Sequence, residues 1–315
     1  MSTYKAVITA RSFGKTDGKA YDCLTAAGIG WVRLAEDAAV EERMRELADA
    51  DALIAGLEEI DDAQMAACPQ LKVISRYGVG YDRVDVAAAR KRGIAVTITP
   101  GANGDSVADL AVALMLDAAR GVSRMDASIR AGHTSRVQGL EMYGKVLGVI
   151  GAGRIGKGVA RRCRGFDMKI LVNDVFEDEA FARETGAEYV ELDRLLREAD
   201  FISVHSPLTS ETEGLIGRDA FAKMKESAVL VNTARGGIVD EEALLEALQA
   251  NRIRAAALDA TVHEPPQDSP LARCENCILT PHAGAATEEA SSRMSRMAAQ
   301  NVIDILIGGT CRYQI

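Results

Sequence analysis

A glycine triplet at a strand-to-helix junction is the feature that most limits how this chain can fold. The apolar segment 146–150 is typical of a buried strand, and a helical pattern follows it. Gly151, Gly153 and Gly156 stand at the junction. This spacing lets the first glycine turn tightly, the second admit a pyrophosphate to the backbone, and the third pack the helix on the strand. Because the helix start also offers free N–H groups to phosphates, the pattern predicts a dinucleotide-binding unit.

An acidic residue completes this pattern one strand later. Asp174 follows the apolar segment 169–173, close to the spacing at which a carboxylate binds the adenosine ribose. There it would accept hydrogen bonds from both ribose hydroxyls and repel a 2′-phosphate, so the sequence favours NAD over NADP. The alternative is that the glycines mark ordinary turns and that Asp174 is a surface acid.

Apolar runs and amphipathic segments alternate along the chain, which predicts βαβ units and parallel sheets. A length of 315 residues favours two domains. The expected strands form two series: 6–9, 31–34, 52–55, 71–75 and 95–98, then 146–150, 169–173, 201–204, 228–232, 255–258 and 277–279. The six strands of the second series, with their intervening helices, predict a doubly wound sheet.

Turn-forming residues at 99–105 separate the two series, and residues 106–131 are expected to form one long helix. A second long helix, 287–307, is expected to return the chain to the first domain. The predicted fold class is α/β, with a Rossmann NAD-binding domain at 101–287. A smaller, flavodoxin-like α/β substrate domain would combine residues 1–100 and 288–315.

Composition excludes several other classes of protein. Hydrophobic residues make up 48% and charged residues 26% of the chain, the balance of a soluble globular protein. The net charge of -9 and the lack of a basic tract argue against a nucleic-acid partner. No secretory or membrane-spanning pattern is present, which indicates a cytoplasmic protein without a membrane partner. The six dispersed cysteines, Cys274 and Cys277 among them, are expected to be reduced thiols, and no metal site is expected.

Three ionisable residues follow three strands of the second series. Arg235 comes after strand 228–232, Glu264 after 255–258 and His282 after 277–279. The carboxyl ends of parallel strands share one edge of a sheet, where ligands bind. The three side chains are therefore expected to converge, although each alone has an equally plausible structural role.

Their chemistry suits the reduction of a keto group. Such a reduction needs a proton donor that titrates near neutral pH, and His282 supplies an imidazole. A carboxylate from Glu264 would stabilise the protonated ring and fix its tautomer. The fork of Arg235 would hold a substrate carboxylate and could polarise the carbonyl. The set predicts an NAD-dependent oxidoreductase for a small 2-keto or 2-hydroxy acid.

Several blocks of residues, in order and nearly end to end, resemble the D-isomer-specific 2-hydroxyacid dehydrogenases. That family includes phosphoglycerate dehydrogenases and glyoxylate or hydroxypyruvate reductases. The blocks are residues 75–82 (SRYGVGYD), 151–156, 205–209 (HSPLT), 232–237 with 239–241, 264–265 and 280–284 (TPHAG). The resemblance implies hydride transfer between NAD and a small acid of the phosphoglycerate, glycerate/hydroxypyruvate or glyoxylate class.

The resemblance also implies roles for single residues and a homodimer formed through the NAD-binding domain. Arg235, Glu264 and His282 would be catalytic. The implied cofactor contacts are Gly151, Gly153, Arg154, Ile155, Gly156, Asp174, Ser206, Thr233, Ala234, Asp259 and Gly284, with Asp259 on the nicotinamide carboxamide. The implied substrate contacts are Arg235 and the N–H groups around Gly78, Val79 and Gly80, with Asn103 nearby. Paired glycines such as Gly78 and Gly80 also mark ordinary turns.

The chain departs from the family pattern in places that concern the substrate pocket. Arg130-Ala-Gly-His133 continues without the usual aromatic residue, and Ala260-Thr261 replaces a bulkier pair. His263 is a further candidate for substrate contact, although an exposed turn histidine is the more common case. The chain ends near the closing helix, so the regulatory domain of some phosphoglycerate dehydrogenases is expected to be absent.

Two other functions compete with a 2-hydroxyacid dehydrogenase. One is an NAD-sensing, non-enzymatic protein, like the transcriptional corepressors that share this fold. The other is an enzyme acting on formate or phosphite. Glyoxylate, hydroxypyruvate, 3-phosphohydroxypyruvate and bulkier keto acids are all compatible with the motifs.

Overall fold

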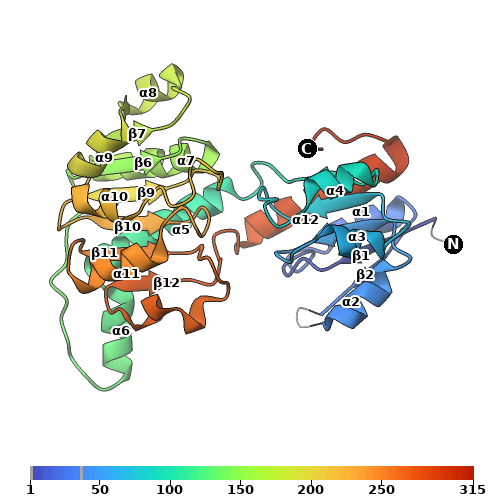
Figure 1. The fold of residues 1–315 in the computed structure, drawn as a ribbon, viewed down its shortest axis with the longest axis horizontal. Helices are drawn as coiled ribbons and strands as arrows, with labels where there is room; N and C mark the ends of the chain where they lie inside the picture. The colour runs from blue at the N-terminus through green and yellow to red at the C-terminus, as the bar shows by residue number, and fades with distance from the viewer. Residues whose placement is uncertain (1–2, 36–37) are drawn as a thin grey trace. The chain divides into compact units, whose positions relative to one another are not determined.

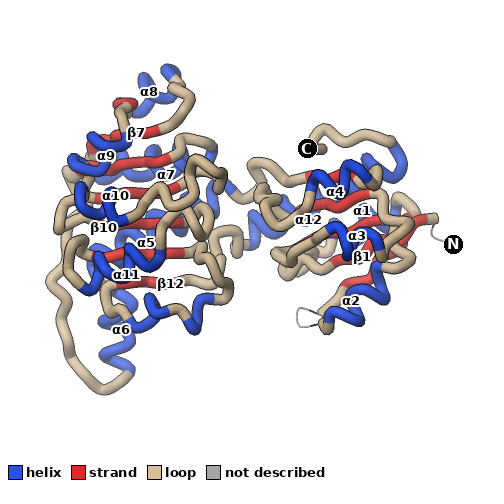
Figure 2. The backbone as a smooth tube through the Cα atoms, viewed as in Figure 1, coloured by secondary structure: helices blue, strands red, loops and turns tan. Residues whose placement is uncertain are grey.

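The computed structural model describes residues 3–35 and 38–315, which form two compact units. Unit 1 combines Met1–Asn103 with Ala285–Ile315, and unit 2 is Gly104–Gly284. The sequence placed the two domain crossings after residues 100 and 287. Each unit is an α/β structure with its own sheet (Figures 1 and 2).

Unit 1 is built on a five-stranded parallel sheet with the strand order β2-β1-β3-β4-β5. This is the order of flavodoxin-like folds. The strands are β1 (Tyr4–Ile8), β2 (Ile29–Arg33), β3 (Ala52–Ala55), β4 (Val73–Arg76) and β5 (Ala95–Thr97). The helices are α1 (Lys19–Ala26), α2 (Val40–Leu47), α3 (Asp62–Ala66), α4 (Val86–Lys91) and α12 (Glu288–Gly308).

Both faces of this sheet are covered, as a parallel sheet requires. Successive strand residues point to opposite faces. Ile8 of β1 therefore belongs to the core under α1 and α12, whereas Val7 belongs to the core under α2, α3 and α4. This arrangement explains why the strands are short, continuous apolar runs.

Unit 2 contains a seven-stranded parallel sheet with the order β12-β11-β10-β9-β6-β7-β8. Its strands are β6 (Val146–Ile150), β7 (Lys169–Asn173), β8 (Glu188–Tyr189), β9 (Phe201–Val204), β10 (Val229–Asn232), β11 (Ala255–Leu258) and β12 (Cys277–Leu279). Its helices are α5 (Gly104–Arg120), α6 (Val122–Arg130), α7 (Arg154–Cys163), α8 (Glu179–Thr185), α9 (Leu192–Glu198), α10 (Arg218–Lys223) and α11 (Glu241–Gln249). Three short 3₁₀ helices are η1 (Arg164–Phe166), η2 (Pro266–Asp268) and η3 (Pro270–Arg273).

The strand order of unit 2 reverses between β6 and β9, which pair directly. In a doubly wound sheet, ligands bind outside the carboxyl ends of the strands at such a reversal. Helices α5, α7 and α8 contribute to the core on one face, and α9, α10 and α11 to the core on the other. The predicted fold class, a Rossmann domain with a second α/β domain, is confirmed.

Two sequence predictions for unit 2 were wrong. The helix expected over residues 106–131 is divided at Gly121, whose φ of 63° takes the backbone out of the helix. The Asp117 carboxylate accepts a hydrogen bond from the Ser123 N–H at 2.8 Å and so supports the start of α6. The sheet also has a seventh strand, β8, whose two residues are too few to show a periodic pattern.

Among residues 3–35 and 38–315, no helix is both long enough and apolar enough to cross a membrane.

Candidate active site

The glycine triplet forms the tight turn from β6 to α7. Gly151 has a φ of 89°, and a Cβ there would lie 2.6 Å from the Ser206 backbone nitrogen. A Cβ at Gly156 would lie 2.1 Å from the Gly151 carbonyl oxygen. Neither position can hold a side chain without movement of the backbone.

The same turn leaves room for a ligand. A Cβ at Gly153 would meet nothing within 4 Å, so the surface above this residue is open. Arg154 and Ile155 begin α7, and no side chain caps the start of this helix. Its first N–H groups therefore remain available to a phosphate. This geometry fits the pyrophosphate of a dinucleotide.

Asp174 lies beside the glycine turn, after β7. Its Oδ2 accepts a hydrogen bond from the Ala152 N–H at 2.5 Å, and its Oδ1 accepts one from the Phe176 N–H at 2.9 Å. These contacts fix the carboxylate next to the glycine turn. Such a position suits a residue that binds the adenosine ribose.

His205, at the end of β9, was not selected as a site residue from the sequence. Its Nε2 lies 2.8 Å from the Ser203 Oγ and its Nδ1 lies 3.4 Å from the Thr233 Oγ1. Its backbone N–H donates to the Ile150 carbonyl at 2.7 Å. Burial lowers the pKa of His205 to about 3, so the ring is neutral at neutral pH. A histidine at the carboxyl end of a central strand was the available signal.

The depressed pKa of His205 predicts a loss of stability in mild acid. The unfolded chain binds a proton near pH 6.5 that the folded chain excludes, so stability falls as pH drops below that value, by about 1.4 kcal/mol per unit. Chemical unfolding should show that His205→Asn loses less stability than wild type between pH 7 and pH 5, by about 2 kcal/mol. The exposed His133, changed to Asn, is the control. Equal pH dependence in wild type and His205→Asn would contradict the prediction.

The loop after β10 holds Arg235 in place. The Asn232 Oδ1 accepts a hydrogen bond from the Ala234 N–H at 3.0 Å, and its Nδ2 donates to the Arg235 carbonyl at 2.8 Å. A Cβ at Gly236 would lie 2.2 Å from the Thr261 carbonyl carbon. The Arg235 loop therefore packs directly against the segment that leads to Glu264.

Glu264 and His282 form the close pair that the sequence predicted. The His282 Nδ1 lies 2.8 Å from the Glu264 Oε1, and their side chains are only 25% and 15% exposed. A carboxylate accepts hydrogen bonds, so the ring proton on this side lies on Nδ1. The other ring nitrogen, Nε2, is then the one that can face a reacting group.

Asp259 fixes the turn that carries His282. Its Oδ1 accepts hydrogen bonds from the Thr280 Oγ1 at 2.6 Å and the Ala283 N–H at 2.7 Å, and its Oδ2 accepts one from the Gly284 N–H at 2.8 Å. His282 has a φ of 54°, which costs a residue with a side chain about 1–3 kcal/mol. The buried Asp259 carboxylate offsets this strain by binding both sides of the turn. Its contact with the nicotinamide stays a prediction.

The expected substrate contacts Gly78, Val79 and Gly80 follow β4 in unit 1. Gly78 has a φ of 146°, in the region that favours glycine. The buried guanidinium of Arg76 donates from Nε to the Gly80 carbonyl at 2.9 Å and from Nη1 to the Ala55 carbonyl at 3.1 Å. Asn103 is the last residue of the first segment of unit 1 and is half-buried.

The NAD-binding domain model of the D-isomer specific 2-hydroxyacid dehydrogenases matches residues 112–284, more than half of the chain. The chain belongs to the D-isomer specific 2-hydroxyacid dehydrogenase family. It is an oxidoreductase that uses NAD, as the glycine triplet and Asp174 predicted. The match lies within unit 2, where the glycine turn and the His282 pair are found.

Relatives of this dehydrogenase carry two kinds of name. A glyoxylate reductase of Korarchaeum cryptofilum is 46% identical over 263 residues, which cover 81% of this chain and 79% of that protein. A D-3-phosphoglycerate dehydrogenase of Methanocaldococcus jannaschii is 44% identical over 285 residues, 89% of this chain and 54% of that protein, so the chain spans about half of its length. The crystal structure of a glyoxylate reductase from Paecilomyes thermophila is 30% identical, with a TM-score of 0.86 over 100% of this chain and 99% of that one.

His263 and the six cysteines were also singled out in the sequence of this dehydrogenase. His263 is exposed beside Glu264, and its carbonyl accepts a hydrogen bond from the Thr261 Oγ1 at 2.9 Å. All six cysteines are free thiols, and burial raises the pKa of Cys277 to about 12. Within the described part of the chain, no group of three or more His, Cys, Asp or Glu residues could hold a metal ion.

Proposed function

We propose that this dehydrogenase transfers a hydride between NAD and a small 2-keto or D-2-hydroxy acid of the glyoxylate, glycerate/hydroxypyruvate or phosphoglycerate class. The observation that carries the proposal is the 2.8 Å pair of His282 and Glu264, with the Arg235 loop packed against the same segment. The names of the relatives, glyoxylate reductase and D-3-phosphoglycerate dehydrogenase, support an acid of two or three carbons.

The side chains of unit 2 then divide the chemistry among them. Bound NAD supplies or accepts the hydride. His282 would deliver a proton from Nε2 to the carbonyl oxygen, while Glu264 holds the ring through Nδ1. Arg235 would bind the substrate carboxylate with two parallel hydrogen bonds and polarise the carbonyl. For unit 1, we propose the role of substrate domain, with the N–H groups around Gly78–Gly80 on the same carboxylate and Asn103 nearby.

The cofactor would be held along the carboxyl edge of the unit 2 sheet. Asp174 would bind the adenosine ribose, and the start of α7 the pyrophosphate. Asp259 would bind the nicotinamide carboxamide. The proposed contacts are Gly151, Gly153, Arg154, Ile155, Gly156, Asp174, Ser206, Thr233, Ala234, Asp259 and Gly284.

A panel of substrates tests the proposed function directly. Glyoxylate, hydroxypyruvate, 3-phosphohydroxypyruvate and pyruvate are each mixed with NADH and the whole chain, and loss of NADH absorbance is followed. We expect turnover of at least one two- or three-carbon keto acid. Formate and phosphite with NAD are included, and activity on these alone would contradict the proposal.

The same panel separates the enzyme from a sensor. A sensor would bind NADH, measured by calorimetry, yet leave every keto acid unchanged. That combination would reject the proposed activity and favour the NAD-sensing alternative.

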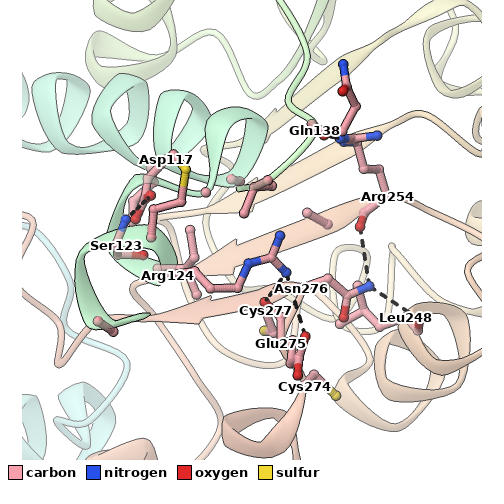
Figure 3. Close-up of a pocket in the computed structure, with 18 of the residues that line it drawn as sticks. Asp117, Ser123, Arg124, Gln138, Leu248, Arg254, Cys274, Glu275, Asn276 and Cys277 are labelled. Carbon is pink, nitrogen blue, oxygen red and sulfur yellow. Dashed lines mark hydrogen bonds and ion pairs between the residues drawn. The ribbon is translucent and has the colours of Figure 1, made fainter. Parts of the chain in front are cut away.

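We also propose that the chain forms a homodimer through unit 2. Helix α6 has no buried residue, and its Val122 and Ile129 are 57% and 60% exposed. Beside it lies a hollow of about 1500 Å³, across which Arg124 of α6 reaches Glu275 (Figure 3). Exposed apolar side chains next to a large hollow are typical of an interface. Light scattering that gave only the monomer mass of 33.6 kDa would contradict the dimer.

A further inference from the structure

The loop that follows β3 places a carboxylate at the carboxyl edge of the unit 1 sheet. Glu58 is half-buried, and its Oε1 accepts a hydrogen bond from the Thr9 Oγ1 at the end of β1. The Thr9 Oγ1 in turn accepts a hydrogen bond from the Gly56 N–H at 3.3 Å. A Cβ at Gly56 would lie 2.8 Å from the Glu58 Oε2. The carboxylate therefore folds back over this glycine and is fixed at the ends of β1 and β3.

The neighbouring strand carries the loop proposed to hold the substrate carboxylate. Strand β4 pairs with β3 in register, and Gly78–Gly80 follow it. The Arg76 guanidinium joins the two strand ends, because it donates both to the Ala55 carbonyl and to the Gly80 carbonyl. Adjacent strands lie about 5 Å apart, so Glu58 is about one or two strand spacings from the Gly78–Gly80 loop.

Two charges of opposite sign lie on neighbouring strand ends along this edge. Arg76 is 4% exposed and places a positive charge beneath the Gly78–Gly80 loop, where a substrate carboxylate would bind. Glu58 places a negative charge beside it, over β1 and β3. Arg11, two residues beyond Thr9, is exposed, so solvent screens its charge more strongly. The edge therefore suits a ligand with a single anionic end.

We propose that Glu58 determines the substrate class by excluding phosphorylated keto acids in favour of those with an uncharged side chain. The inference rests on the proposed function and on the carboxylate site at Gly78–Gly80. A phosphate monoester carries about −1.5 to −2 charges at pH 7 and offers only acceptors, so the Glu58 carboxylate repels it. Hydroxypyruvate carries an uncharged hydroxyl in place of the phosphate, and glyoxylate brings no further group, so neither acid adds a second anion for Glu58 to repel.

The test compares kcat/KM for hydroxypyruvate and 3-phosphohydroxypyruvate in wild type, Glu58→Gln and Glu59→Gln. Glutamine keeps an oxygen that can accept from Thr9 and removes the charge at nearly the same size. The kcat/KM of the wild type should be more than about tenfold higher for hydroxypyruvate than for 3-phosphohydroxypyruvate. Glu58→Gln should raise kcat/KM for the phosphorylated acid about tenfold, the equivalent of about 1.4 kcal/mol. Its kcat/KM for hydroxypyruvate should change by less than about threefold, a smaller effect because that acid has no second charge.

The exposed Glu59, the next residue in the loop, is the matched control, and Glu59→Gln should leave the ratio of the two kcat/KM values within about twofold of wild type. The wild-type preference should also shrink as salt is raised, because salt screens the repulsion. An unchanged ratio in Glu58→Gln, or a wild type that prefers the phosphorylated acid while still reducing hydroxypyruvate, would overturn the inference alone. No turnover of either acid, nor of glyoxylate, by the wild type would overturn the proposed function together with it.

Discussion

Replacing His282 with alanine should lower kcat for the reduction of a keto acid by about 10²–10⁴-fold, the range typical of a lost general acid. The His282 Nδ1 is occupied by Glu264 at 2.8 Å, so Nε2 is the only ring nitrogen left to deliver a proton. Alanine leaves solvent as the donor, which is not positioned. Steady-state kinetics with saturating NADH and the best keto acid of the panel measure the effect.

A measurement of NADH binding distinguishes the loss of the proton donor from a disrupted cofactor site. The dissociation constant of NADH for His282→Ala should stay within about threefold of wild type, because Asp174 is held by the Ala152 and Phe176 N–H groups and Gly151 packs against Ser206. His133→Ala, which removes an exposed imidazole from the loop after α6, should keep wild-type kinetics. If His282→Ala retained near wild-type kcat, the acid/base assignment would be wrong.

The strands that position this site were predictable because both faces of each sheet are covered. Val146–Ile150 and Phe201–Val204, the two strands at the reversal of the sheet, have the bounds that their apolar runs indicated. A buried parallel strand needs apolar side chains in both directions, so it appears in the sequence as an unbroken run. The end of helix α5 was harder to predict, because apolar residues continue on both sides of Gly121 and periodicity alone does not show where the backbone turns.

The sequence could predict that the site residues meet only to the extent that it predicted which strands are neighbours. The pairings Asn232 with Leu258 and Leu258 with Leu279 bring the loops after β10, β11 and β12 to one edge. The role of Asp259 depends on hydrogen bonds between the loops after β11 and β12, which have no local sequence pattern. A single buried carboxylate that binds three groups of another loop can be recognised only from coordinates.

The position of Arg235 predicts that its removal will have a second large effect on kcat/KM for the keto acid. Its loop is fixed by Asn232 and by the close packing of Gly236 on Thr261, so the guanidinium starts from an ordered backbone. A fixed fork loses little conformational freedom when it binds a carboxylate. The contribution of Arg235 should therefore be that of a charge-assisted pair in a partly water-free site rather than that of a surface ion pair.

Arg235→Ala should lower kcat/KM for the keto acid by about 100-fold or more, because truncating one partner of such a pair costs about 2–5 kcal/mol. Both a higher KM for the keto acid and a lower kcat are expected, since the guanidinium would bind the carboxylate and polarise the carbonyl. Arg235→Lys keeps the charge but loses the fork, so it should fall between wild type and Arg235→Ala. A rise confined to the KM for NADH would instead indicate that Arg235 contacts the cofactor. Equal activity of Arg235→Lys and wild type would show that the paired hydrogen bonds of the guanidinium are not required.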